Sequence, residues 1–99
     1  MKKLKGSQRT YLRGLAHRLK PVIQVGKNGL TGELILAAQE ALHAHELIKV
    51  KFLDFKEAKT ELSRVIEART ESEMVGLIGN IALFYRPHPE QEKRKIKLP

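Results

Sequence analysis

Four consecutive residues, Gly26, Lys27, Asn28 and Gly29, combine the properties that a phosphate-binding loop requires. Glycine permits backbone conformations and close approaches that a side chain prevents. The lysine at the tip adds a mobile positive charge, and a helix that begins just after the loop would present free N–H groups. The segment therefore suits a phosphate of a nucleic-acid backbone. An ordinary turn explains the same residues, and both interpretations stay open.

Positively charged side chains extend this candidate surface. A basic stripe at helical spacing follows from the positions of Arg9, Arg13, His17 and Lys20. A solvated helix face usually carries acidic residues as well, and this stripe has none. Lys49 and Lys51 share one side of a predicted strand, and Arg86 follows the last strand. We expect these seven side chains and the loop to contact RNA.

The distribution of charge supports a polyanionic partner. The net charge of the whole chain is +8. Residues 1–32 contain eight basic residues and no acidic residue, so the positive charge is concentrated in this segment. Cysteine is absent, which excludes disulfides and thiolate metal sites. No apolar run approaches the roughly 18 residues of a membrane span. We expect a cytoplasmic, monomeric protein without a cofactor, a metal, a membrane partner or a small-molecule substrate.

A small enzyme acting on RNA is the alternative hypothesis. His17 or His45 would then serve as a general acid or base. A metal site is not favoured, because His43 and His45 are two residues apart and do not share a helix face. Binding to RNA cannot separate an enzyme from a binding protein, but turnover can.

The elements that must position these residues follow from the hydrophobic pattern. Helices are predicted from Ser7, as N-cap, to Leu19, and from Gly32 to Ala44 with Thr31 as N-cap. Leu12, Leu15, Ala16 and Leu19 should form the core side of the first helix. Strands are predicted at Pro21–Val25 and Leu47–Leu53. In the second strand, Ile48, Val50 and Phe52 should face inward, opposite the two lysines.

The second half of the chain continues the alternation. Asp54 and Glu57 form a capping-box pattern before a helix that ends near Thr70. The inward positions of that helix are predicted to be Ala58, Leu62, Val65 and Ile66. Gly79-Asn80 joins two apolar runs, Met74–Ile78 and Ile81–Arg86, as a hairpin. The predicted fold is α/β (α+β), a single domain ordered helix–β–helix–β–helix–β–β with a four-stranded mixed sheet.

Several segments resemble the YhbY family, the bacterial stand-alone form of the CRM domain. The similarity runs in order from residue 11 to residue 86, through Tyr11–His17, Pro21–Thr31, Glu46–Lys51 and Gly79–Arg86. The resemblance implies a fold like the C-terminal domain of translation initiation factor three. It also implies binding of ribosomal RNA in precursors of the large ribosomal subunit, with Gly26–Gly29 as the RNA-contact loop. On this basis residues 7–87 form the RNA-binding domain, 1–6 a flexible basic arm and 88–99 a charged tail.

Overall fold

Four strands form one mixed sheet in the computed structural model, which describes residues 3–99. The strands are β1 (Ile23–Val25), β2 (Leu47–Phe52), β3 (Glu73–Ile78) and β4 (Ile81–Tyr85), and the helices are α1 (Gly6–Ala16), α2 (Gly32–His45) and α3 (Lys59–Thr70). The sheet order is β1-β2-β4-β3, with β1 and β2 parallel and the other neighbours antiparallel. The predicted element order, the mixed sheet and the hairpin at Gly79-Asn80 are confirmed.

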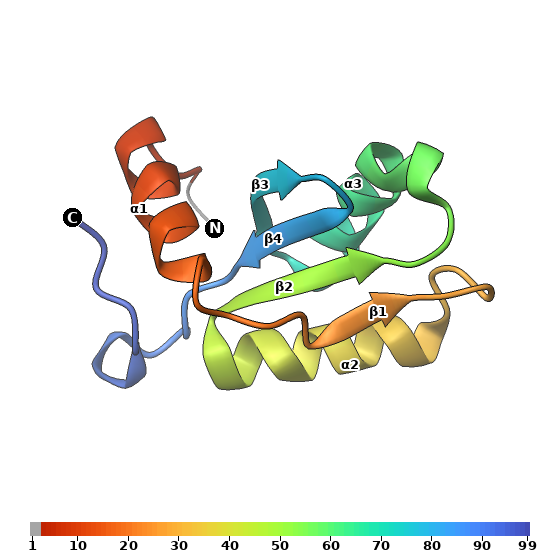
Figure 1. Cartoon of the computed structure of the whole chain (residues 1–99). Helices are drawn as coiled ribbons and strands as arrows, with labels where there is room; N and C mark the ends of the chain where they lie inside the picture. Colours follow the sequence, from red (N-terminus) through yellow and green to blue (C-terminus); the bar gives the residue numbers. More distant parts are fainter. Residues whose placement is uncertain (1–2) are drawn as a thin grey trace.

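Two helices cover one face of the sheet along its length. Figure 1 shows α2 beneath β1 and β2, and α3 behind β3 and β4 on the same face of the sheet. The main core lies between these helices and the sheet, and its largest members include Leu42, Ile66, Val50, Phe52 and Phe84. The inward direction predicted for Ile48, Val50 and Phe52 is confirmed. This packing fixes the orientation of β2 and leaves its two lysines on the other face.

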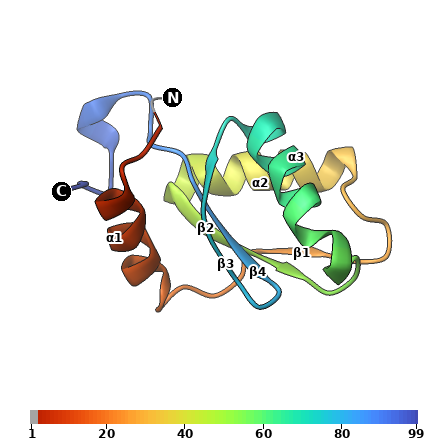
Figure 2. The same ribbon diagram turned by 90° about the horizontal axis from the view of Figure 1, so that it is seen from above.

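The opposite face is covered by α1 at one end only (Figure 2). There Leu12 and Ala16 pack with residues from the start of β2 and the end of β4 in a second cluster. Beyond α1 the sheet continues without a covering helix. Gln24, Lys49 and Lys51 lie on this part, which we call the open face; Gln24 and Lys51 are exposed and Lys49 is half-buried.

The first helix is shorter than predicted. It begins at Gly6 rather than after Ser7 and ends at Ala16, where Leu19 N–H donates to the Ala16 carbonyl oxygen at 3.0 Å. Leu15 and Leu19 are exposed, contrary to prediction. The reason is geometric, because α1 meets only the end of the sheet and needs a narrow apolar face there.

The start of α3 also differs from its prediction. The structure shows no side-chain cap at this helix, and a 3-10 turn, Lys56–Ala58, precedes it. The capping box predicted for Asp54 and Glu57 is therefore wrong. Val65 is exposed, and Ser63 faces the core instead. The helix is rotated relative to the prediction because it packs through Ser63, Ile66 and Thr70.

Other boundaries shift by one to a few residues. β1 starts at Ile23 rather than Pro21; Pro21 has no N–H to donate, and Val22 N–H makes a single bond to the Lys49 carbonyl oxygen before the paired residues begin. The Thr31 cap is confirmed, with Leu34 N–H donating to Thr31 Oγ1 at 3.0 Å, and α2 continues to His45. β2 ends at Phe52, β3 begins at Glu73 and β4 ends at Tyr85.

Both terminal segments pack against the domain. Residues 1 and 2 of the predicted arm lie outside the described residues, but Leu4 is buried and its N–H donates to Glu73 Oε1 at 3.0 Å. In the tail, Ile96 and Leu98 pack on the second cluster. The prediction of a flexible arm over residues 1–6 is therefore wrong for residues 4–6, because the buried Leu4 side chain holds that segment to the end of the sheet.

Candidate nucleic-acid interface

The Gly26–Gly29 loop is a closed turn at one end of the sheet. Gly29 N–H donates to the Gly26 carbonyl oxygen at 3.0 Å, and Gly29 has a φ of +66°. This left-handed conformation favours glycine. The side chains of Lys27 and Asn28 are exposed at the tip. The turn interpretation and the binding interpretation are thus compatible, because the turn presents both side chains to solvent.

An exposed aromatic ring lies beside this loop. Leu53 N–H and Asp54 N–H both donate to the Val25 carbonyl oxygen, at 2.9 and 3.1 Å, so the segment after β2 runs next to the loop after β1. Phe55 has a left-handed φ of +57° and is 48% exposed. Its ring is 3.5 Å from the position that a Cβ on Gly29 would occupy. Phe55 and the exposed Lys56 therefore extend the loop surface.

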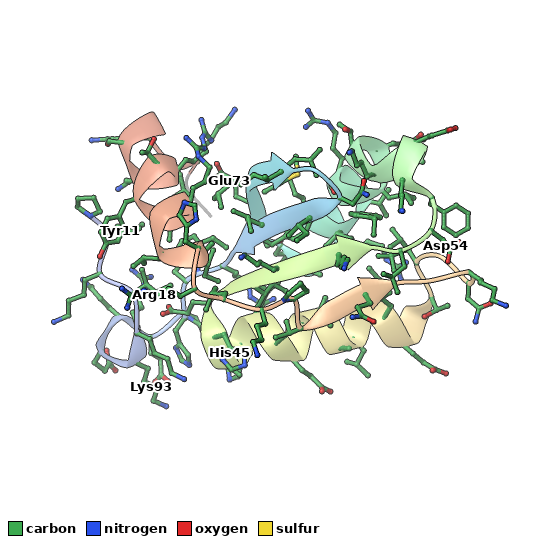
Figure 3. The ribbon with its side chains drawn as sticks, viewed as in Figure 1. Tyr11, Arg18, His45, Asp54, Glu73 and Lys93 are labelled. Carbon is green, nitrogen blue, oxygen red and sulfur yellow. The ribbon has the colours of Figure 1, made fainter. Side chains whose placement is uncertain are left out.

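Acidic groups are not absent from this end. Asp54 is labelled in Figure 3 at the same end of the molecule and is exposed. Lys59 donates through Nζ to the Gly79 carbonyl oxygen at 2.6 Å, which ties α3 to the hairpin. Lys27, Lys51 and Lys56 are exposed positive side chains at this end.

The strand lysines lie on the open face, as predicted. Lys49 pairs with Leu83 and Lys51 pairs with Ile81 across β2 and β4. Paired residues of neighbouring strands point to the same side, and Leu83 belongs to the cluster under α1. Both lysines are therefore on the α1 side of the sheet. Gln24 pairs with Lys51 from β1, so the open face leads toward the loop that follows β1.

The basic stripe of the first helix is divided by the structure. Arg9 forms an ion pair with Glu73, and Figure 3 shows Glu73 between α1 and β3. Arg13 donates from Nη1 to the Val75 carbonyl oxygen at 2.8 Å, and its stem lies against Gly76. His17 and Lys20 follow the helix and are exposed. Two members of the stripe thus attach α1 to the sheet, and two remain available to a ligand.

Arg86 also makes contacts within the protein. It donates from Nη1 to the Thr70 carbonyl oxygen at 2.8 Å and from Nη2 to the Gln39 carbonyl oxygen at 3.1 Å. Both carbonyls belong to the helices on the covered face. The structure therefore does not bring Arg86 together with the lysines of the open face.

The histidines that the alternative hypothesis uses lie apart from any metal-binding group within residues 3–99. His17 and His45 are both exposed, and His45 is the last residue of α2. Among these residues no group of three or more histidine, aspartate or glutamate side chains could hold a metal ion. The helices described over the same range are all too short or too polar to span a membrane.

Sequence reasoning missed Glu46, which anchors the C-terminal tail. The residue is 1% exposed, and its carboxylate accepts hydrogen bonds from three backbone N–H groups of the tail: His88 (2.7 Å), Lys95 (2.6 Å) and Ile96 (2.9 Å). Its own φ is +65°. A glutamate between a helix and a strand gives no sequence signal for such a role, because the groups that it binds lie more than 40 residues away.

A protein-family model matches the part of the chain, residues 11–86, in which the sequence resembles the YhbY family. The model of the CRS1/YhbY (CRM) domain matches residues 4–86. An RNA-binding protein of Haemophilus influenzae is 41% identical over 100 residues, which cover 100% of this chain and 98% of the relative. The probable RNA-binding protein YqeI of Bacillus subtilis is 38% identical over 97 residues, covering 97% of this chain and 99% of YqeI.

A solved structure has the same fold. The solution structure of a hypothetical protein from Staphylococcus aureus superposes with a TM-score of 0.80 at 37% identity. The match covers 98% of this chain and 100% of that chain. The arrangement of three helices on a four-stranded mixed sheet is therefore found in an experimentally determined relative.

Proposed function

The chain belongs to the CRS1/YhbY (CRM) domain family, and on that premise we propose that it is an RNA-binding protein that contacts the RNA backbone through Gly26–Gly29. The observation that carries the proposal is the exposed Lys27-Asn28 tip, held by a hydrogen-bonded turn at the end of a sheet. The positive charge of Lys27 attracts phosphate, and Asn28 offers an amide N–H₂ to a phosphate oxygen.

The contact surface extends from the loop to its neighbours. Phe55 offers a ring on which a base can stack, and Lys51 and Lys49 continue the positive surface along the open face. His17 and Lys20 are exposed in the segment that leads to Val22, whose N–H donates to the Lys49 carbonyl oxygen at 3.1 Å. Arg9, Arg13 and Arg86 serve the fold in this proposal.

The RNA in this proposal is ribosomal RNA within precursors of the large ribosomal subunit. The support for it is the family resemblance of residues 11–86. A monomeric factor acting in the cytoplasm belongs to the same proposal. Crosslinking the chain to RNA in cells, followed by sequencing of the bound RNA, tests it. Enrichment of large-subunit ribosomal RNA is expected, and enrichment of messenger RNA alone would contradict the ribosomal assignment.

The protein is proposed to bind RNA without cleaving or modifying it. The exposed positions of His17 and His45 support this, because a general acid or base works best in a site that excludes water. Labelled ribosomal RNA incubated with the protein, with and without divalent metal, should remain intact. Turnover that disappears in His17→Ala or His45→Ala would instead favour the enzyme hypothesis.

A further inference from the structure

A groove lies at the end of the molecule opposite the Gly26–Gly29 loop. It is formed where the tail, the segment before α1 and the end of β4 meet, and Figure 1 shows these parts at the far end from the β1–α2 loop. The long dimension of the molecule is 38 Å. The groove is therefore a separate place of contact and not part of the loop surface.

The walls of the groove combine apolar and positively charged groups. The accessible apolar part consists of Pro87, Pro89 and Leu98, above the buried Leu4 and Tyr85. The positive part consists of Lys3, Lys5 and Arg94. Among the described residues that line it there is no acidic side chain; Glu92 borders the adjoining hollow beside Ile96. A ligand that is flat and apolar on one side and anionic on the other matches this composition.

The groove is built by contacts that hold the tail. Glu46 fixes the backbone at His88, Lys95 and Ile96, and Gln8 Nε2 donates to the Pro99 carbonyl oxygen at 3.3 Å. Its volume is about 560 Å³, within the range of about 300–1,000 Å³ that is usual for small-ligand sites. A single nucleotide fits a space of this size.

We propose that this groove binds one unpaired nucleotide of a bound RNA. The base packs against Pro87, Pro89 and Leu98, and the phosphate lies among Lys3, Lys5 and Arg94. The inference rests on the proposed RNA-binding function, and it adds a second contact that recognises an unpaired nucleotide rather than backbone alone. A protein partner with an acidic segment is the competing occupant, and the test includes it.

Nuclear magnetic resonance of the isotope-labelled full chain tests the groove directly. Uridine 5′-monophosphate and a short single-stranded RNA should shift the amide signals of Gln8, Arg94 and Leu98. Inorganic phosphate should bind about tenfold more weakly than the nucleotide, because it cannot use the apolar wall. Equal binding of phosphate and nucleotide, or shifts with an acidic peptide only, would overturn the proposal.

Variants locate the binding within the groove. Arg94→Glu should weaken binding of the nucleotide about tenfold, because it reverses a charge at the phosphate. Lys93→Glu is the matched control: Lys93 is the neighbouring residue on the tail, does not line the groove and should stay within about twofold of wild type. Equal weakening by both variants would contradict the assignment.

A second variant avoids any effect on the tail. Arg94 Nε donates to the His88 carbonyl oxygen at 2.8 Å, so its replacement can loosen that segment. Lys5→Glu lies outside the tail, at the start of α1, where a negative charge is compatible with the helix dipole. Lys5→Glu should also weaken binding of the nucleotide about tenfold. Wild-type affinity in this variant would contradict the proposal.

The two proposals fail in different ways. If the nucleotide leaves the groove signals unchanged while RNA still shifts residues 26–29, the groove inference is wrong and the RNA-binding function stands. If RNA shifts neither region at low salt, the proposed function itself is wrong.

Discussion

Gly26 and Gly29 are the same residue type with different structural demands. Gly29 has a left-handed φ of +66°, whereas a Cβ on Gly26 would meet nothing within 4 Å. We expect Gly29→Ala to destabilise the protein by about 1 kcal/mol, because an L side chain strains that conformation. Gly26→Ala should stay within about 0.5 kcal/mol of wild type. Chemical denaturation of both variants provides the comparison.

The same pair separates turn formation from RNA contact. If RNA approaches the Gly26 backbone, Gly26→Ala should weaken RNA binding while its stability is unchanged. Equal stability of the two variants would show that the left-handed conformation of Gly29 is not a constraint on the fold.

The Tyr85 phenol makes stability depend on alkaline pH. Burial raises the pKa of Tyr85 above the ordinary value of 10.0, Glu46 raises it further and Arg94 lowers it. The folded state thus favours the neutral phenol. This contribution to stability is present below pH 10.0, the ordinary pKa of tyrosine. It is lost as the pH rises from 10.0 through the higher pKa of the folded state. Unfolding free energy should fall over that range.

Urea denaturation at several pH values on both sides of 10.0 measures this dependence. Tyr85→Phe should lose stability less steeply with pH than wild type, since it removes the titrating group. Tyr11→Phe is the control, because Tyr11 is 41% exposed. The same alkaline slope in wild type and Tyr85→Phe would show that another group causes it.

At the residue scale the loop was predictable and its aromatic neighbour was not. Gly26–Gly29 is visible in the sequence because glycine and a charged tip mark a loop. Phe55 gives no comparable signal, because an aromatic residue is usually part of a core. Its exposure depends on the left-handed backbone after β2, which the sequence does not indicate.

At the scale of elements, Arg13 connects α1 to β3. Its guanidinium donates to the Val75 carbonyl oxygen at 2.8 Å, and its stem fills the space above Gly76. We expect Arg13→Ala to reduce the free energy of unfolding by about 1–3 kcal/mol, because a half-buried carbonyl loses its donor. Arg18→Ala should have an effect within about 0.5 kcal/mol, since Arg18 is exposed. Thermal unfolding distinguishes the two variants.

The hypothesis that Arg13 belongs to an exposed, RNA-binding stripe predicts a different result for the same substitutions. In that case Arg13→Ala and Arg18→Ala would be equally stable, and Arg13→Ala would weaken RNA binding. The structure predicts instead that Arg13 acts through the position of α1.

The tail depends on Glu46. A glutamine there offers one acceptor oxygen and turns an N–H₂ donor toward backbone donors. We expect Glu46→Gln to cost about 2 kcal/mol of stability. Amide exchange should accelerate at residues 88, 95 and 96 and not in β2. Unchanged exchange at these three amides would contradict the anchoring role.

Three features were predicted correctly from a local pattern, whereas the capping box at Asp54 and Glu57 was not. The period-two pattern of β2, the Thr31 cap and the Gly79-Asn80 hairpin each rest on neighbouring residues, and the structure contains all three. The extent of α1 and the packing of the tail were not predictable, because both depend on contacts with distant segments. Leu4 meets Glu73, and residues 88–96 meet Glu46.

At the scale of the whole molecule, the positive charge of the first 32 residues has two uses. Part of it attaches α1 to the sheet, through Arg9 and Arg13. Arg18, Lys20 and Lys27 are exposed between α1 and α2, and Lys3 and Lys5 are exposed where they line the groove beside the tail. Net charge therefore indicated the class of partner, whereas the structure was needed to find which basic residues make contacts within the fold.

The central claim is that the Lys27-Asn28 tip contacts RNA. The most direct test is the affinity for a structured RNA as a function of salt, measured for wild type, Lys27→Ala and Asn28→Asp. Lys93→Ala, which also removes one positive charge from an exposed side chain, is the control.

Lys27→Ala should weaken binding across different RNA sequences and lower the salt slope by about one contact. Asn28→Asp should weaken binding more, because it places a negative charge beside the phosphate, and Lys93→Ala should bind like wild type. All variants should unfold at the wild-type midpoint. If Lys27→Ala and Asn28→Asp both bind RNA with wild-type affinity and salt dependence, the loop is not the RNA contact.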